Sequence, residues 1–375
     1  MITLFLCGDV MTGRGVDQVL PHPGDPRIHE PHARSAGMYV ELAERAHGPI
    51  PRPVDFAYVW GDALEELARV RPGARIVNLE TSITRSDDYW RGKGINYRMH
   101  PDNVPCLTAA HIDCCVLANN HALDYGYPGQ LETLATLRAA GVQSAGAGRN
   151  LAEARTPAVI DVPGTGRVIV FGFGTATSGI FPRWAATDDR PGVNLLEDLS
   201  DASVGRIREM VRRVKQPRDV VVASIHWGGN WGFAVPEEHV RFAHGLIRAG
   251  VDVVHGHSSH HVRPIEVFEG KLILYGCGDF LDDYEGIAGY EEFRDDLTLM
   301  YFPVVDPSTG RLADLHMTPM QIRRFKANRA SRDDAAWLME TVNRESPKYD
   351  FRAELRDDDH RLELRSVGRP PGRRP

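Results

Sequence analysis

The chain has 375 residues, of which 42% are hydrophobic and 25% charged, a composition typical of a globular protein with a sizeable core. Its net charge of −7 gives no basic surface for nucleic acid, and five cysteines without a C-x-x-C pair argue against a disulfide framework. The first strand starts directly after Met1, and no run of about 18 apolar residues follows. We therefore expect a cytoplasmic protein with reduced, buried thiols and neither signal peptide nor membrane anchor. The oligomeric state stays open.

The first half of the chain alternates between strand-like and helix-like segments. A Pro- and His-rich stretch at 21–35 is expected to be a long loop, and the polar stretch 80–100 is expected to cover strand ends. The predicted elements are, in order, strand 2–7, helices 36–47 and 57–70, strand 74–79, strand 113–118 and helix 128–141.

The second half adds hairpins to this alternation. The predicted elements are hairpin 157–174, helix 202–215, strand 219–225, helix 236–250, strand 251–255, hairpin 264–276, strands 297–305 and 311–325, and helix 333–344. Hairpins among strand–helix units favour an α/β fold with two mixed sheets flanked by helices over one doubly wound sheet. We expect one catalytic domain over 1–325 and an appendage over 326–375, whose Arg- and Pro-rich end is expected to be mobile.

Five strand-like runs end at residues that can bind a metal ion. Ligands in open α/β sheets lie beyond the carboxyl ends of strands, where such residues would meet. Carboxylate and amide oxygens together with imidazole nitrogens suit a divalent ion that assists hydrolysis or acts as a Lewis acid. Each residue alone has a structural alternative, such as a helix cap, a turn or a core histidine, but their recurrence after strands favours one shared site. The candidate ligands are Asp9, Glu80, Asn120, His226 and His257, with His260 beside them.

Motifs along the chain resemble the calcineurin-like metallophosphoesterase superfamily. The resemblance is closer to its CapA branch, which is named for poly-γ-glutamate capsule proteins, and it spans residues from about 2 to 300. It implies the calcineurin-like fold, with two mixed β-sheets packed face to face and flanked by helices. The motifs are GDVMTG, NLE, ANNHALDYG, HWGGNW and GHSSHHVRPIEVFEGKLILYGCGDF.

The resemblance also implies roles for individual residues. Asp9 would open the first metal position, Glu80 would be the bridging carboxylate, and Asn120, His226 and His257 would complete the second position. His121 would be the unligated histidine that transfers protons, with Asp124 and Tyr125 shaping the site around it. His260 matches the last histidine of the GH…H element.

Four positions depart from the family pattern. Met11 stands where superfamily phosphatases carry a metal-binding histidine, and Asn230, Ser258 and Asp279 replace Glu, His and Asn of CapA relatives. A thioether is a poor ligand for a hard divalent ion, so we expect one divalent ion (Ca, Mn, Mg or Zn) rather than two. Phosphoester hydrolysis without a second ion loses its main stabilisation.

The resemblance extends to soluble CapA-like proteins encoded with lasso-peptide clusters, which invert a Cα centre in a ribosomally made peptide. It implies a metal-dependent peptide epimerase, because a histidine oriented by a carboxylate suits proton abstraction and return. A phosphoesterase is the alternative, and a non-catalytic polyglutamate- or capsule-related binding protein is the second. The acid/base candidates are His121, Asp124, His260 and Asp279.

Aromatic and basic residues near these motifs are candidates for binding a peptide substrate. They can line a groove in which a cation holds a carboxylate, or the aromatic side chains can pack the mouth of the core while the charges are solvated. The candidates are Lys93, Tyr97, Arg98, Trp227 and Trp231.

Overall fold

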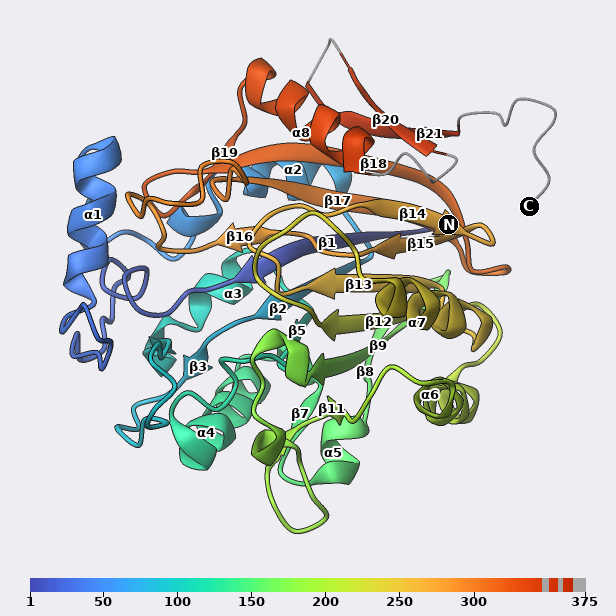
Figure 1. The fold of residues 1–375 in the computed structure, drawn as a ribbon, viewed down its shortest axis with the longest axis horizontal. Coiled ribbons are helices and arrows are strands. Elements are labelled where there is room, and N and C mark those ends of the chain that lie inside the picture. Colours follow the sequence, from blue (N-terminus) through green and yellow to red (C-terminus); the bar gives the residue numbers. More distant parts are fainter. Residues whose placement is uncertain (346–350, 357–359, 367–375) are drawn as a thin grey trace.

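A computed structural model describes residues 1–345, 351–356 and 360–366. Within these residues two mixed β-sheets pack face to face (Figure 1). The first sheet has the order β20-β21-β18-β17-β1-β2-β5-β6, with β16 beside β1 and β19 beside β18. Its strands are β1 (Ile2–Val10), β2 (Ala74–Leu79), β5 (Cys114–Val116), β6 (Gln143–Ala145), β16 (Asp279–Leu281), β17 (Leu297–Asp306), β18 (Arg311–Ile322), β19 (Ala327–Arg329), β20 (Phe351–Leu355) and β21 (Leu362–Ser366).

The second sheet has the order β11-β9-β12-β13-β15-β14, with β8 beside β9. Its strands are β8 (Ala158–Val162), β9 (Gly166–Thr175), β11 (Leu195–Leu196), β12 (Asp219–His226), β13 (Val253–His257), β14 (Ile265–Phe268) and β15 (Lys271–Leu274). Two small ribbons pair β3 (Ser82–Ile83) with β4 (Arg98–Met99) and β7 (Ala147–Gly148) with β10 (Gly192–Val193).

The central strands are buried on both faces because their side chains alternate between two cores. On β1, Leu4 and Leu6 face the core between the sheets, while Phe5 faces the core under the helices of the first sheet. On β12, Val222 faces the inter-sheet core and Val221 the outer core. This alternation explains why both strands read as continuous apolar runs in the sequence.

Helices cover the outer face of each sheet. Residues of α1 to α4 pack into the outer core of the first sheet, and residues of α6 and α7 pack on the second. The predicted fold class, two mixed sheets flanked by helices, is confirmed. The helices are α1 (Gly37–His47), α2 (Ala63–Val70), α3 (Pro105–Ala109), α4 (Gly126–Ala139), α5 (Leu151–Arg155), α6 (Asp201–Val214), α7 (Glu237–Arg248) and α8 (Arg332–Glu345), with 3-10 turns η1 (Tyr58–Trp60), η2 (Pro101–Asn103), η3 (Ala176–Ser178) and η4 (Pro182–Trp184).

The C-terminal segment extends the first sheet. Strands β19 and β21 both pair with β18, and α8 lies beside them in Figure 1. The domain boundary at residue 325 stays a prediction, and residues 367–375 of the predicted mobile tail lie outside the described residues. All five cysteines are free and buried, as expected. Among the described residues, no helix has the length and apolar character needed to span a bilayer.

Candidate metal centre

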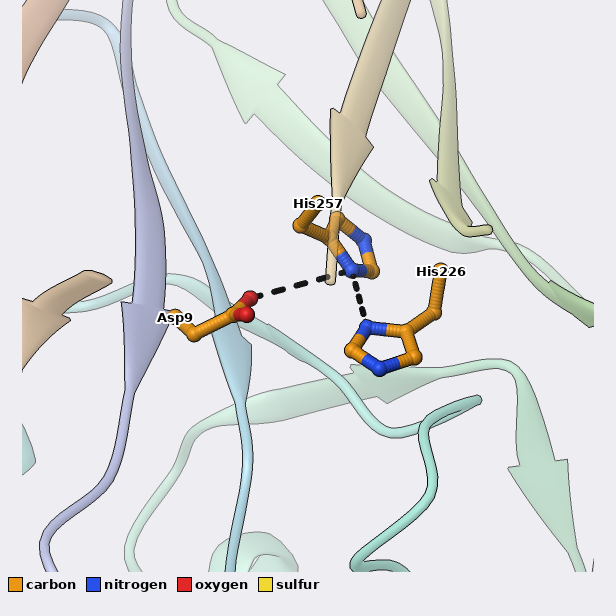
Figure 2. Close-up of side chains that lie close together, drawn as sticks. All are labelled: Asp9, His226 and His257. Atoms are coloured by element: carbon orange, nitrogen blue, oxygen red, sulfur yellow. Dashed lines mark hydrogen bonds and ion pairs between the residues drawn. The ribbon is translucent and has the colours of Figure 1, made fainter. Parts of the chain in front are cut away.

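The candidate centre lies where the carboxyl ends of strands from both sheets meet. In the first sheet, Asp9 on β1 pairs in register with Asn78 on β2 and with Asp279 on β16. In the second sheet, His226 and His257 are register partners at the ends of β12 and β13. Figure 2 shows Asp9 of one sheet pointing toward the two histidines of the other. The structure thus brings these distant strand ends together, and their role as metal ligands stays a prediction.

Asp9, His226 and His257 form the first group of potential ligands. All three side chains are buried, and their ligand atoms lie within 4.8 Å of one another. The Nδ1 atom of His257 is 3.9 Å from Oδ1 of Asp9 and 2.8 Å from Nδ1 of His226. The other ring nitrogen of His226 is 3.9 Å from Oε1 of Glu80, which places Glu80 next to this group.

A second group consists of Asp9, His260 and Asp279, whose ligand atoms also lie within 4.8 Å of one another. The Nδ1 atom of His260 is 2.9 and 3.0 Å from the two carboxylate oxygens of Asp279. Met11 is buried, and its sulfur accepts a hydrogen bond of 3.6 Å from the hydroxyl of Tyr284. The backbone N–H of Met11 donates to the carbonyl of Leu281 at the end of β16, the strand that carries Asp279.

Three carboxylates at the centre are buried, and within the described residues none of them forms an ion pair with an arginine. Asn78 donates hydrogen bonds to Asp9 at 2.8 Å and to Glu80 at 3.2 Å, which holds these two together. Burial raises the pKa of Asp9, and burial together with the charge of Asp9 raises the pKa of Glu80 and of Asp279. The ionised form of such a carboxyl group is unfavourable in the buried site, and a bound cation stabilises it.

The remaining candidate donor groups are neutral, and they also suit a cation. Burial lowers the pKa of His226 and His257 well below the usual value, so both rings have a free lone pair at neutral pH. Within the described part of the chain, the side-chain oxygen of Asn120 and Nε2 of His226 are buried and have no hydrogen-bond partner. Buried polar atoms are rarely left unpaired, so Nε2 of His226, which lies beside Glu80, is a donor atom available to a cation, whereas no contact within those residues places Asn120 with the other candidate ligands. The residues present fit a divalent cation.

His121 lies beside this donor set and contacts Asp124 and Lys93. Its Nδ1 atom is 2.6 Å from Asp124 and 3.0 Å from the ammonium group of Lys93, which also pairs with Asp124 at 2.8 Å. Its Nε2 atom faces Glu80 at 3.7 Å. Burial lowers the pKa of His121 to about 4, so the ring is neutral at pH 7. The predicted pair of His121 and Asp124 is thus in contact, next to the candidate ligands.

Asp124 and Lys93, the two neighbours of Nδ1, favour opposite tautomers of the His121 ring. An ionised Asp124 only accepts, so it favours a hydrogen on Nδ1 of His121 and leaves Nε2 as a base. Lys93 only donates, so it favours a bare Nδ1 and a hydrogen on Nε2, which is then an acid. The structure thus provides His121 with partners for both tautomers.

Two predicted substrate residues are occupied by contacts that hold the structure together. Trp227 is fully buried, donates its indole N–H to the carbonyl of Tyr275 at 3.0 Å and stacks on His239. It has no surface for a substrate, so we assign it a packing role in place of the predicted contact. Arg98 donates to the carbonyl of Ser86 and to Asp87, each at 2.8 Å, and these bonds hold together the polar segment 80–100. The residue type alone did not distinguish these roles from substrate binding.

The other three lie nearer to the candidate centre. Tyr97 is buried with its ring edge against His121, at a centroid distance of 4.6 Å. Trp231 is half-buried, 5.4 Å from the ring of His260, and stacks on Tyr290 at 3.8 Å. With Lys93 they surround the two predicted proton-transfer histidines.

Sequence reasoning gave no role to two asparagines that position the ligands. Asn119 donates to the side chain of Asn78 at 3.0 Å and to the carbonyl of Leu79 at 2.8 Å, and its oxygen accepts from the backbone N–H of His121. Asn78 in turn binds both carboxylates. A polar residue inside the apolar run ARIVNL was the available signal for Asn78, because a fully buried amide requires partners.

Comparison with known proteins identifies the family. The family model "Bacterial capsule synthesis protein PGA_cap" matches residues 3–284. A "probable polyglutamine synthesis accessory protein" of Mycobacterium tuberculosis H37Rv is 49% identical over 96% of this chain and 94% of its own length. The "PGA biosynthesis protein CapA" of Bacillus subtilis is 28% identical over 84% of this chain and 70% of its own length.

Among solved structures, the protein TT1561 of Thermus thermophilus aligns with 83% of this chain and 96% of its own, at 9% identity and a TM-score of 0.37. A similarity of this size supports no conclusion about function. The sequence comparisons confirm the CapA-type assignment made from the motifs. This chain belongs to the bacterial capsule synthesis protein (PGA_cap) family.

Proposed function

We propose that this chain is a metal-dependent peptide epimerase that exchanges a Cα proton between two histidine–aspartate pairs. The observation that carries the proposal is the presence of one such pair at each end of the ligand cluster. His121 and Asp124 lie at the Glu80 end, and His260 and Asp279 lie at the end where β16 pairs with β1.

The hydrogen-bond directions give the two histidines complementary roles. The amide nitrogen of Asn230 lies 2.8 Å from Nε2 of His260 and only donates, so this Nε2 has a lone pair and acts as the base. His121 carries a hydrogen on Nε2 when Lys93 donates to its Nδ1, and it then acts as the acid. A base and an acid on two sides of one carbon are what inversion requires. A bound divalent ion supplies positive charge that stabilises the negative charge developing on the neighbouring carbonyl.

The substrate class follows from two resemblances. The likeness to soluble proteins encoded with lasso-peptide clusters supports a ribosomally made, lasso-type precursor peptide. The relatives are named for polyglutamine synthesis and for PGA biosynthesis, and these names support a polymer of glutamine or glutamate as the other substrate. Every residue of either substrate has a Cα–H that can be inverted, and we propose that Lys93 and Trp231 contact the substrate.

A phosphoesterase is the second candidate, and the second ligand group favours it. If His260 and Asp279 bind a second ion together with Asp9, they are ligands and not an acid/base pair. Two ions can orient the attacking and leaving oxygens of a phosphoester, a role that one ion does not fill. The two candidates therefore assign different tasks to the same residues, and ion stoichiometry separates them. A non-catalytic binding role, in keeping with the relative named an accessory protein, predicts no turnover.

The test is deuterium uptake at Cα in D₂O with Mn²⁺, on a lasso-type precursor peptide and on poly-γ-glutamate, analysed by mass spectrometry and chiral amino-acid analysis. We expect uptake with inversion, lost on His121→Ala and on His260→Ala. His244→Ala is the matched control, because His244 pairs with Glu266 at 2.9 Å in a histidine–carboxylate contact outside the candidate site. Two ions per chain with hydrolysis of an aryl phosphate would establish the second candidate instead. Polymer binding that survives metal removal, with no exchange, would establish the third.

A further inference from the structure

His255 is a buried histidine with no part in the mechanism above. It lies on β13 two residues before His257, so both side chains project from the same face of the strand. Both are fully buried. A buried imidazole requires hydrogen-bond partners, and those of His255 lead directly to the candidate ligand.

The first link fixes the hydrogen on His255. Its Nε2 atom is 2.8 Å from the backbone carbonyl oxygen of Cys7 on β1. A carbonyl oxygen only accepts, so Nε2 of His255 carries the hydrogen. His255 is fully buried, and its ring nitrogens contact a carbonyl and a hydroxyl rather than a carboxylate, so the ring is neutral and its Nδ1 is an acceptor.

In the second link, the hydroxyl group of Ser224 determines which ring nitrogen of His257 carries the hydrogen. The Oγ atom of Ser224 on β12 is 3.0 Å from Nδ1 of His255 and 2.9 Å from Nε2 of His257. Serine has one hydroxyl hydrogen, and Nδ1 of His255 takes it. The same oxygen must then accept from His257, so Nε2 of His257 carries the hydrogen and Nδ1 has the lone pair.

The third link reaches the metal centre. Nδ1 of His257 faces Nδ1 of His226 at 2.8 Å and Asp9 at 3.9 Å. Because Nδ1 of His257 accepts, Nδ1 of His226 donates, and the lone pair of His226 is on Nε2. That atom is the buried nitrogen without a partner that lies 3.9 Å from Glu80. Each histidine therefore has its hydrogen-free nitrogen on the side of the candidate site. In His226 this atom is Nε2, and in His257 it is Nδ1, whose lone pair accepts the hydrogen of His226.

We infer that Ser224 and His255 are positioning residues that hold His257 in the tautomer whose Nδ1 carries no hydrogen, anchored on the backbone of β1. The chain of bonds joins the two sheets, so it also fixes the ring of His257 relative to Asp9. This inference rests on the metal dependence of the proposed function. Partners that orient a ligand histidine typically contribute a factor of about 10 to 100 in metal affinity.

The experiment is a calorimetric titration of the full chain with Mn²⁺ alone. Ser224→Ala is expected to weaken binding on the order of 10- to 100-fold. His255→Leu is expected to weaken it at least as much, because the freed hydroxyl of Ser224 then donates to Nε2 of His257 and favours the wrong tautomer. His255→Asn, whose side-chain oxygen replaces the acceptor Nδ1, is expected to restore most of the affinity. Ser203→Ala is the matched control, because Ser203 is buried on α6 and its hydroxyl donates to Asp198, outside the candidate centre.

The tautomer itself is measured by ¹⁵N NMR of the metal-free protein, with the signals of His257 assigned by their loss in His257→Gln. We expect a hydrogen on Nε2 in the unsubstituted chain and a mixture of tautomers in Ser224→Ala. A hydrogen on Nδ1, or Mn²⁺ binding by Ser224→Ala as tight as in the unsubstituted chain, overturns the inference and leaves the proposed function standing. A chain that shows the Nε2 tautomer but binds no divalent ion overturns the proposed metal dependence instead.

Discussion

Two clusters of buried charge lie close together in this protein, and they differ in how the charge is balanced. In the first, Arg14 pairs with Glu30 at 2.9 Å and with Asp283 at 2.5 Å, and its guanidinium lies over the ring of Tyr39 at 3.5 Å. In the second, Asp9, Glu80 and Asp279 face neutral histidines. Both sets are almost completely inaccessible to solvent.

The difference separates a structural cluster from a functional one. Burial alone would lower the pKa of Arg14, but Asp283, Tyr97 and Glu30 together raise it, so the first cluster is complete as it stands. The second cluster has carboxylates with raised pKa values and, among the described residues, donor atoms without partners, a combination typical of a functional site and suited to a cation. Burial identifies both clusters, and only the charge balance tells them apart.

Replacing Arg14 by Met tests the complete cluster and has the largest expected effect on stability. It leaves the carboxylates of Glu30 and Asp283 buried without a cation, which typically costs about 3–5 kcal/mol. Denaturant unfolding of the metal-free chain measures the loss. Arg27→Met is the control, because Arg27 pairs with Asp25 at the surface and is expected to change stability by less than about 1 kcal/mol. Equal effects of the two substitutions would mean that the buried pairs contribute no more than a surface pair.

Replacing Asp9 by Asn tests the incomplete cluster, because Asp9 belongs to both ligand groups. We expect the affinity for Mn²⁺ to fall at least about 100-fold, so that a concentration which stabilises the unsubstituted chain by roughly 2.7 kcal/mol stabilises the variant hardly at all. Thermal unfolding with and without Mn²⁺ measures this stabilisation in both chains. Asp219→Asn should keep the affinity, because Asp219 pairs with Arg167 at the opposite end of β12 from His226. Retained stabilisation in Asp9→Asn would contradict the assignment.

Glu66 provides a smaller test, on a carboxylate whose pKa moves in the opposite direction to that of Glu80. Burial alone would raise the pKa of Glu66, but hydrogen bonds from Arg69, Thr318 and Arg329 lower it to about 2. A lowered pKa contributes stability that is present above the unfolded value of 4.5 and is lost as pH falls toward 2. We expect Glu66→Gln to cost about 2 kcal/mol at pH 7, and the difference from the unsubstituted chain to shrink over this window. A constant difference between pH 5 and pH 2.5 would exclude the ionic contribution.

The elements that the sequence predicted are those with long hydrophobic patterns. Strand 74–79 and helix 36–47 were predicted within one residue, because apolar residues and glycine or proline mark their ends. The two-residue strands β3, β4, β7, β10 and β11 were missed, because so short a segment has no period to detect. Their pairing depends on tertiary contacts that bring residues 80–100 and the segment after β9 against other strands.

The same distinction holds for the candidate site: residues marked by a local sequence pattern were predicted, and residues defined by tertiary contacts were not. Asp9, His226 and His257 were predicted because each stands at the end of an apolar strand, and topology brings such ends together. The sequence does not say on which side of the backbone an aromatic ring packs, and Trp227 therefore read as a substrate residue although it is core. The roles of Ser224 and His255 depend on hydrogen bonds across two strands and a second sheet, which no local pattern encodes.

Replacing Glu80 by Gln has the smallest expected effect and the most informative sign. Burial raises the pKa of Glu80 in the folded chain above the unfolded value of 4.5. Its contribution to stability is therefore present below pH 4.5 and is lost as pH rises. At pH 7 the ionised carboxylate is unfavourable in the metal-free folded chain. A neutral amide keeps the contact with Asn78 and removes that cost, so metal-free Glu80→Gln is expected to be more stable at pH 7 by about 1 kcal/mol. Below pH 4 the gain should disappear, since the carboxyl is protonated in both states. A variant that is destabilised without metal, as Glu66→Gln is expected to be, would mean that the carboxylates of the candidate centre are already balanced and that no cation is required there.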